Sequence, residues 1–450
     1  MKEFNFEKLP IVEIANEIIM DAVNKGASDI HFDPSQDSLK IRFRIDGILS
    51  DYSIIPSKYK RNMISRIKMI AGMNIMETRL PQDGAIKSKI GERFLDLRVS
   101  SLPTNNAEKI VIRILDYSMS LAGLDNLGFS EDAMEKINRL IKIPNGIILV
   151  TGATGTGKST TLYSILQKLN TEAVNVITVE DPVEMDIEGI NQVQTQSEIG
   201  LTFATILRSI LRQDPNIIMI GEIRDDETAR IAVRASITGH LVLSSLHTNN
   251  SLNTIERLTD MDVERYLLGS SLEGIISQRL ARKVCPECSI KRPTTDYERQ
   301  VFKTVLGKDV LEMVVANKEG CPKCTHGYKG RLAILEVLVM NEQIKDAITN
   351  GANKNTLREL VYTGDVVTLL QDGLNKVVLG ETTFEEILKI VDLENDMTQY
   401  NDDNLKTNLK MAQQAHKVDN KTNDKPITSN ITSEFKIEKT NNENIETVEF

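Results

Sequence analysis

The chain has 450 residues, 40% of them hydrophobic, and a formal net charge of −10. This length exceeds one ordinary hydrophobic core and predicts two or three domains, while the negative charge argues against a surface that binds nucleic acid. No stretch approaches the roughly 18 uninterrupted apolar residues of a membrane span, and the N-terminal residues lack the apolar core of a secretory signal. We therefore expect a cytoplasmic protein.

The first part of the chain predicts an α+β domain. Apolar residues recur at helical spacing from Ile11 to Val23, and Gly26 is placed to end that helix. Polar and apolar residues then alternate around the turn Asp46-Gly47, which predicts a hairpin. The predicted elements after the first helix are strands over 40–45 and 48–55, a helix over 58–71, strands over 85–90 and 93–100, and a strand over 109–115. We assign residues 1–115 to this domain and 116–127 to a linker.

Strands and helical stretches alternate from residue 128 to residue 248. Four segments have the near-continuous hydrophobicity of strands that are buried on both faces: GIILVT (146–151), NVITVE (175–180), NIIMIGE (216–222) and HLVLSSLHT (240–248). Their alternation with helices predicts a parallel sheet covered on both faces. Helical patterns dominate beyond it, so we expect a core over 128–284 and a helical part over 331–394. Residues 395–450 contain few aromatic residues and are predicted to be disordered.

A phosphate-binding motif directly follows the first of these strands. It matches G-x-x-x-x-G-K-[ST] and comprises Gly152, Ala153, Thr154, Gly155, Thr156, Gly157, Lys158, Ser159 and Thr160. Glycines let several backbone N–H groups face one anion, and the positive end of the following helix points to the same place. We expect Lys158 to reach the outer phosphates and the Ser159 hydroxyl to bind Mg²⁺. The strand before the motif and the helix after it argue against a chance match.

The four cysteines form two C-x-x-C pairs, Cys285 with Cys288 and Cys321 with Cys324. In a reducing compartment this spacing favours a metal over disulfides, and the natural interpretation is a tetrahedral four-cysteine zinc site. A redox dithiol would need only one pair. Protein ligands would fill all four positions, so we expect the zinc to be structural, in a subdomain over 285–330.

Acidic residues at the ends of two predicted strands are candidates for catalysis. Hydrolysis of a phosphoanhydride needs one carboxylate for the attacking water and another near the metal. Glu222 lies just beyond an apolar strand, at the end of the sheet where ligands bind. Glu180 and Glu184 follow another strand. The alternative for each is an ordinary exposed carboxylate.

Two histidines and two arginines are weaker candidates on the residues alone. His240 and His247 begin and nearly end one predicted strand, and an isolated histidine is more often structural than catalytic. Arg98 and Arg113 lie on predicted strands of the N-terminal domain. Arginines on alternating strands usually face water.

Taken together and in this order, these motifs resemble the type II secretion and type IV pilus assembly ATPases, the GspE/PilB class. The resemblance covers about residues 8–390. The residues that carry it are Ala27-Ser28-Asp29-Ile30-His31, Arg42-Phe43-Arg44-Ile45-Asp46-Gly47, Leu80-Pro81-Gln82-Asp83-Gly84, the phosphate loop, Thr178-Val179-Glu180-Asp181-Pro182-Val183-Glu184, Gly221-Glu222-Ile223-Arg224-Asp225, Thr238-Gly239-His240, His247-Thr248-Asn249 and the cysteine pairs.

The resemblance implies a RecA-like P-loop NTPase core preceded by a PAS-like α+β domain. It further implies an ATP-driven homo-hexamer that powers assembly of a pilus or pseudopilus at the cytoplasmic face of a membrane, acting on a polytopic inner-membrane platform protein. Assembly and secretion motors of this family typically carry the cysteine pairs, whereas retraction motors lack them. Many members begin with an additional recruitment domain, whereas here the first predicted helix starts within ten residues, so we expect recruitment to work differently.

The family resemblance also implies roles for single residues. It makes Glu222 the catalytic carboxylate, and it places Glu180 and Glu184 near the metal and the nucleotide. His247 would sense the γ-phosphate with His240 as its support. The arginines at 98 and 113 would swing onto the phosphates when the N-terminal domain closes.

Two alternatives to a motor remain open at this point. One is a nucleotide-gated scaffold with little turnover, and the other is a RecA-like DNA translocase. The intact Lys158, Ser159 and Glu222 count against the scaffold, and the acidic composition counts against the translocase.

Overall fold

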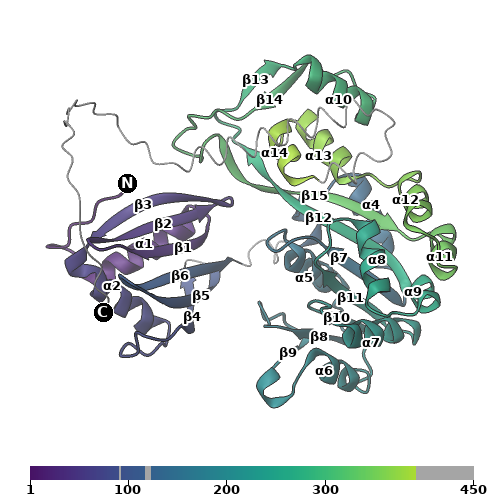
Figure 1. Ribbon diagram of the computed structural model, residues 1–450, viewed down its shortest axis with the longest axis horizontal. Helices are drawn as coiled ribbons and strands as arrows, with labels where there is room; N and C mark the ends of the chain where they lie inside the picture. The colour runs from purple at the N-terminus through teal and green to yellow at the C-terminus, as the bar shows by residue number, and fades with distance from the viewer. Residues whose placement is uncertain (91–92, 117–122, 392–450) are drawn as a thin grey trace, which may run out of the picture.

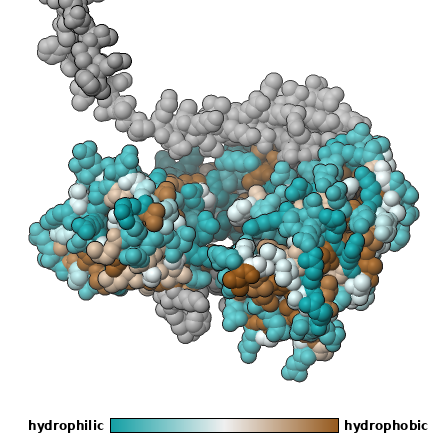
Figure 2. Space-filling model, turned by 60° about the horizontal axis from the view of Figure 1, so that its bottom comes forward, coloured by the Kyte–Doolittle hydropathy of each residue, from teal (hydrophilic) through white to brown (hydrophobic). Residues whose placement is uncertain are grey.

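The computed structural model describes residues 1–90, 93–116 and 123–391. The chain forms two lobes (Figure 1): an N-terminal lobe, residues 1–116, and a core lobe, residues 123–391. Figure 2 shows them as two adjacent masses whose surface is mostly hydrophilic on the face in view.

The N-terminal lobe is built on one antiparallel sheet. Among the described residues it has six strands in the order β3-β2-β1-β6-β5-β4: β1 (Ala27–Pro34), β2 (Ser38–Ile45), β3 (Ile48–Pro56), β4 (Gln82–Ile90), β5 (Arg93–Thr104) and β6 (Ala107–Asp116). Helices α1 (Ile11–Asn24) and α2 (Ser57–Ile70) pack their apolar sides into the same hydrophobic cluster as the strands. Strand β1 is not predicted by the sequence pattern; it pairs between β2 and β6 in the middle of the sheet.

The core lobe contains a mainly parallel sheet. Within the described part of the chain its strand order is β15-β12-β7-β11-β10-β8-β9: β7 (Gly146–Thr151), β8 (Val176–Glu180), β9 (Asn191–Gln194), β10 (Ile217–Ile220), β11 (Leu241–Leu246), β12 (Leu272–Val284) and β15 (Tyr328–Val339). The four predicted strands pair in parallel in the order β7-β11-β10-β8. Every residue of β7, β10 and β11 is buried, which explains their uninterrupted hydrophobicity.

Helices cover both faces of this sheet, as two hydrophobic clusters show. One face packs against α4 (Glu131–Leu140) and α5 (Lys158–Leu169). The other packs against α6 (Phe203–Ile210), α7 (Asp226–Ile237), α8 (Ser251–Asp260), α9 (Arg265–Ser271), α11 (Glu342–Thr349) and α12 (Lys354–Tyr362).

The prediction that helices dominate beyond the four apolar strands misses β12 and β15. Strand β12 follows α9 with no glycine or proline between them, and β15 contains three leucines and one alanine, residues that favour helices in isolation. Their pairing decides the outcome, because β12 adds in parallel to β7 and β15 adds antiparallel to β12.

The segment between the two cysteine pairs is itself folded. It contains β13 (Ile290–Pro293), α10 (Asp296–Leu306) and β14 (Glu312–Val315). Apolar residues of this segment share one hydrophobic cluster with α13 (Leu369–Val378) and α14 (Phe384–Ile390). The segment therefore packs on the last helices of the core lobe (Figure 1).

Two other expectations concern a membrane span and the C-terminal residues. Among the described residues, no helix combines the length and apolarity that crossing a membrane requires. The predicted disorder of residues 395–450 concerns a segment outside the described residues.

Candidate active site

The phosphate loop joins β7 to α5 and is packed directly against β12. Gly152 and Gly157 have φ angles of 151° and 89°, values at which a side chain is strained. A Cβ at Gly152 would also lie 2.5 Å from the backbone oxygen of Gln278, and one at Gly157 would lie 2.7 Å from its Nε2. These two glycines are therefore required both by conformation and by space.

Lys158 begins α5 and points its ammonium back at the loop. Its Nζ donates to the backbone oxygens of Gly152, at 2.8 Å, and Ala153, at 3.2 Å. Burial lowers the pKa of Lys158, the nearby Arg279 lowers it further, and Glu222 opposes both. The ammonium and the Glu222 carboxylate thus lie close enough to interact across the site.

Glu222 stands at the centre of an ion-paired cluster. Its Oε2 is 2.8 Å from Nε2 of His247, and its Oε1 contacts Arg224. Burial alone would raise the pKa of Glu222, but the hydrogen bonds from Arg224 and His247 outweigh it and the pKa is lowered. The carboxylate therefore stays ionised, as an acceptor of a proton or of a water hydrogen bond must be.

Neighbouring parallel strands bring these side chains together. Glu222 follows β10 and His247 follows β11, and these strands pair in register, so both emerge at the carboxyl edge of the sheet. The segment that carries Glu222 is fixed by Gly221, whose N–H donates to Val179 at 2.8 Å and whose carbonyl accepts from the Ser245 hydroxyl at 2.7 Å. The phosphate loop leaves β7 at the same edge.

His240 lies at the other edge of the sheet. It precedes β11, whereas His247 follows it, and six strand residues separate the two by about 20 Å. The Nδ1 atom of His240 lies 2.9 Å from the backbone oxygen of Ala235, at the end of α7. In this structure Glu222, and not His240, contacts His247.

Glu180 is buried, and both of its carboxylate oxygens have protein partners. Oε2 accepts from the Tyr163 hydroxyl, while Oε1 accepts from Thr178 at 2.5 Å and from Gln192 at 3.0 Å. The Tyr163 oxygen in turn accepts the backbone N–H of Glu184 at 3.2 Å. Glu180 thus anchors the acidic segment through α5, and Glu184 is the partly exposed carboxylate of that segment.

Arg98 and Arg113 face each other on β5 and β6. Asp29 on β1 is paired in register with Arg113 and holds its Nε at 3.1 Å. Burial raises the pKa of Glu184, and the charges of Arg98 and Arg113 oppose this rise. The charges of the two arginines on the N-terminal sheet therefore act on the acidic segment of the core lobe.

One direct hydrogen bond links the tip of an N-terminal hairpin to the core lobe. Asp46, in the turn between β2 and β3, accepts the backbone N–H of Gly330 on β15 at 3.0 Å. The predicted Asp46-Gly47 turn thus contacts the base of the cysteine segment.

The structure adds three residues that the sequence did not single out as site residues. The sequence could have identified Arg224 as a site residue. It lies two positions after Glu222 in a non-helical segment, so the two side chains are expected to leave the backbone in similar directions. Tyr163 and Gln278 carry no local signal. Tyr163 lies inside the predicted helix α5, and Gln278 lies on β12, a strand that the sequence pattern does not identify.

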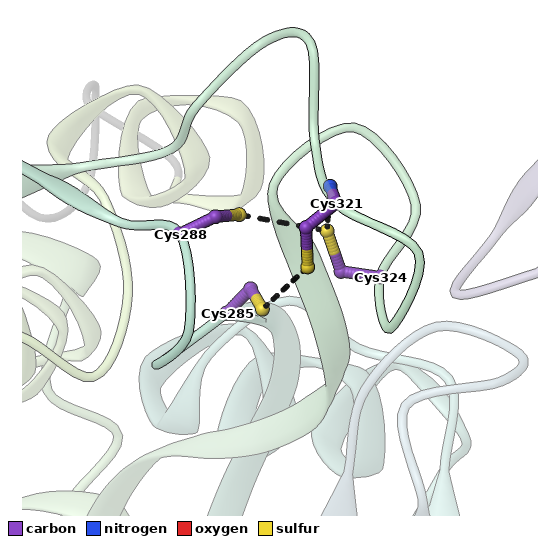
Figure 3. Close-up of side chains that lie close together, drawn as sticks. All are labelled: Cys285, Cys288, Cys321 and Cys324. Atoms are coloured by element: carbon purple, nitrogen blue, oxygen red, sulfur yellow. Dashed lines mark hydrogen bonds between the residues drawn. The ribbon is translucent and has the colours of Figure 1, made fainter.

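The four cysteines converge on one point, as Figure 3 shows. Their sulfur atoms all lie within 4.8 Å of one another, with 3.8 Å between Cys285 and Cys321 and 3.7 Å between Cys288 and Cys324. Zinc–sulfur bonds of about 2.3 Å place the sulfurs of a tetrahedral site about 3.8 Å apart. The geometry and the four-sulfur donor set therefore fit zinc, and all four cysteines are free of disulfides.

Comparison with known proteins shows which family the chain resembles. A model of the family described as Type II/IV secretion system protein matches residues 5–389. The Type II secretion system ATPase E of Vibrio cholerae is 43% identical over 382 residues, which are 85% of this chain and 75% of that protein. The Type IV pilus assembly ATPase PilB of Myxococcus xanthus is 45% identical over 381 residues, 84% of this chain and 67% of that protein.

Solved structures show the same fold. The Legionella pneumophila ATPase DotB superposes with a TM-score of 0.62 at 22% identity, covering 86% of this chain and 97% of that one. The pilus retraction motor PilT with bound ADP superposes with a TM-score of 0.53 at 25% identity, covering 88% of this chain and 98% of that one.

Proposed function

Because this chain belongs to the type II/IV secretion system protein family, we propose that it is a motor ATPase that powers assembly of a type IV pilus or a type II secretion pseudopilus. The observation that carries the proposal is the position of Glu222. It is an ionised carboxylate held by two cationic or hydrogen-bonding partners, at the same sheet edge as an intact phosphate loop.

In the proposed reaction the phosphates of ATP lie in the curve of residues 152–160. Backbone N–H groups of the loop and the first turn of α5 bind them, and Lys158 exchanges its two carbonyl partners for phosphate oxygens. The hydroxyl of Ser159, which is exposed in that first turn, would hold Mg²⁺. When bound, Mg²⁺ would neutralise part of the phosphate charge.

Glu222 then orients the attacking water and accepts its proton. The contacts of His247 and Arg224 with Glu222 would orient the carboxylate toward the phosphate loop, and His247 would sense the γ-phosphate. We assign Glu180 to the positioning of the acidic segment, since its oxygens accept protein donors. Glu184 is then the carboxylate of that segment on which the charges of Arg98 and Arg113 act.

The N-terminal lobe would act as a lid that delivers positive charge. The charges of Arg98 and Arg113 already act on Glu184 of the acidic segment, which supports this role, and a guanidinium can neutralise charge that develops on the transferred phosphoryl group. In a homo-hexamer at the cytoplasmic face of the membrane, closing and opening of this lid would change the shape of the ring. The ring would thereby act on a membrane-embedded platform protein.

The cysteine cluster would hold zinc in a structural role. Cys285, Cys288, Cys321 and Cys324 would take all four positions, so the zinc would join the end of β12 to the start of β15 and leave no position for a substrate.

Steady-state ATPase activity of the purified chain, with and without DNA, tests the proposal. Lys158→Ala sets the background, and sedimentation reports the oligomer. We expect turnover well above that background, no stimulation by DNA and a hexamer in the presence of nucleotide. Activity no higher than Lys158→Ala would support a scaffold instead, and strong stimulation by DNA would support a translocase.

A further inference from the structure

We propose that Gln278 is a positioning residue that holds the phosphate loop in its anion-binding conformation. The side chain lies on β12, is 3% exposed and belongs to none of the motifs described above. The inference rests on the proposed ATPase function only in taking the loop to bind a nucleotide.

Gln278 uses both ends of its side-chain amide. Its Nε2 donates to the backbone oxygen of Thr156 at 2.8 Å, and its Oε1 accepts from the Thr161 hydroxyl at 2.7 Å. Thr156 is in the loop and Thr161 is in the first turn of α5. One amide therefore ties the loop, the helix and a neighbouring strand together.

The bond to Thr156 sets the direction of one backbone N–H group. In a trans peptide the carbonyl and the following N–H point in opposite directions. Because the Thr156 carbonyl points at β12, the N–H of Gly157 points away from β12. Gly157 has φ +89°, so its own conformational preference does not fix this orientation.

The position of β12 makes this contact possible. Ser277 pairs with Thr151, the last residue of β7, so Gln278 is the first residue of β12 past the point where the loop begins. The backbone oxygen of Gln278 is 2.5 Å from where a Cβ at Gly152 would lie. The loop thus packs on Gln278 at both of its ends.

The physical effect is to order a glycine-rich loop before the anion arrives. Fixing a backbone residue costs conformational entropy, and a loop that is already ordered does not lose that entropy on binding. Gln278 itself takes no part in the hydrolysis step. Its loss should weaken phosphate binding and leave the rate of the bound complex nearly unchanged.

The test compares Gln278→Leu and Thr161→Val with the wild-type full-length chain. Both variants remove amide contacts at nearly constant volume. Thr382→Val is the matched control, because the buried Thr382 hydroxyl also donates to a β12 carbonyl, that of Arg282 at 2.8 Å, at the far end of the strand. Thr161→Ser keeps the donor and serves as the conservative rescue.

The measurements are the dissociation constant for ADP, KM and kcat for ATP, and the thermal midpoint. We expect Gln278→Leu to weaken ADP binding and raise KM by about tenfold, as one or two lost hydrogen bonds allow, and Thr161→Val to do so by about threefold. In both, kcat should stay within about threefold of wild type. Thr161→Ser should recover most of the affinity, and Thr382→Val should lose thermal stability without losing affinity.

Several results would overturn the inference. They are an unchanged ADP affinity in Thr161→Val and Gln278→Leu, a fall in kcat at constant affinity, or an equal loss of affinity in Thr382→Val. If Gln278→Leu does not fold, Thr161→Val with its serine rescue decides the question. A wild-type chain that binds ADP without hydrolysing ATP would refute the proposed function but not this inference, because ADP affinity is its readout.

Discussion

Replacing Glu222 by glutamine changes one oxygen at the centre of the candidate site and leaves the size of the side chain unchanged. The carboxylate now contacts His247 through one oxygen and Arg224 through the other. An amide can accept from only one of these partners, and it cannot take a proton from water. The substitution therefore removes the proposed base and disturbs its orientation without opening a cavity.

The expected magnitudes differ sharply between activity and stability. Loss of a general base reduces turnover by about 10²–10⁴-fold, and 100-fold corresponds to about 2.7 kcal/mol of activation free energy. The side chains of Arg224 and His247 are 57% and 48% exposed, and ion pairs at exposed positions contribute about 0–1 kcal/mol each. We therefore expect the two pairs together to change the free energy of unfolding by less than about 2 kcal/mol.

The assay measures kcat, ADP affinity and urea unfolding for Glu222→Gln beside a matched control. Glu227→Gln is suitable, because it makes the same change in an exposed pair with Arg208, whose side chains are 53% and 56% exposed. The control should keep wild-type turnover. A kcat for Glu222→Gln within threefold of wild type would refute the assignment of Glu222 as the base.

Three further predictions concern other parts of the molecule. Purified protein should contain about one zinc per chain, and Cys285→Ser should release it and increase proteolysis within residues 285–330; metal analysis without zinc would contradict this. Arg113→Ala should bind ADP normally but lose about 10²-fold in turnover, and wild-type turnover would show that the arginine is an ordinary surface charge. Burial alone would raise the pKa of Glu386, but hydrogen bonds from Arg282 outweigh it and the pKa is lowered. This pair therefore stabilises the fold fully above the unfolded pKa of about 4.3 and loses its effect as pH falls through the lower folded pKa. Unfolding of Glu386→Gln followed from pH 7 to pH 3 should show a shallower acid loss than wild type, and parallel curves would exclude the effect.

Local sequence was sufficient to predict those features whose physical cause lies in residues close together in the chain. The glycines of the phosphate loop and the helix that starts at Lys158 are neighbours in the chain, so local sequence was sufficient to predict where the loop lies. The Asp46-Gly47 turn likewise needs only two residues with positive φ, and both have them. The cysteine spacing predicted the convergence of four sulfur atoms because few arrangements accommodate two C-x-x-C pairs around one point.

Tertiary structure decided the features that depend on pairing between distant segments, namely the last two strands of the core sheet and the polar side chains that meet in the site. Strands β12 and β15 have no clear local pattern; β12 becomes a strand because it pairs with β7, and β15 because it pairs with β12. That pairing brings Gln278 under the phosphate loop. The direction of β11 places His247 beside Glu222 and His240 at the opposite edge, although the two histidines looked equivalent in the sequence. Which polar side chains meet was therefore fixed by strand order and direction, and these are set by the packing of the whole sheet and not by any single segment.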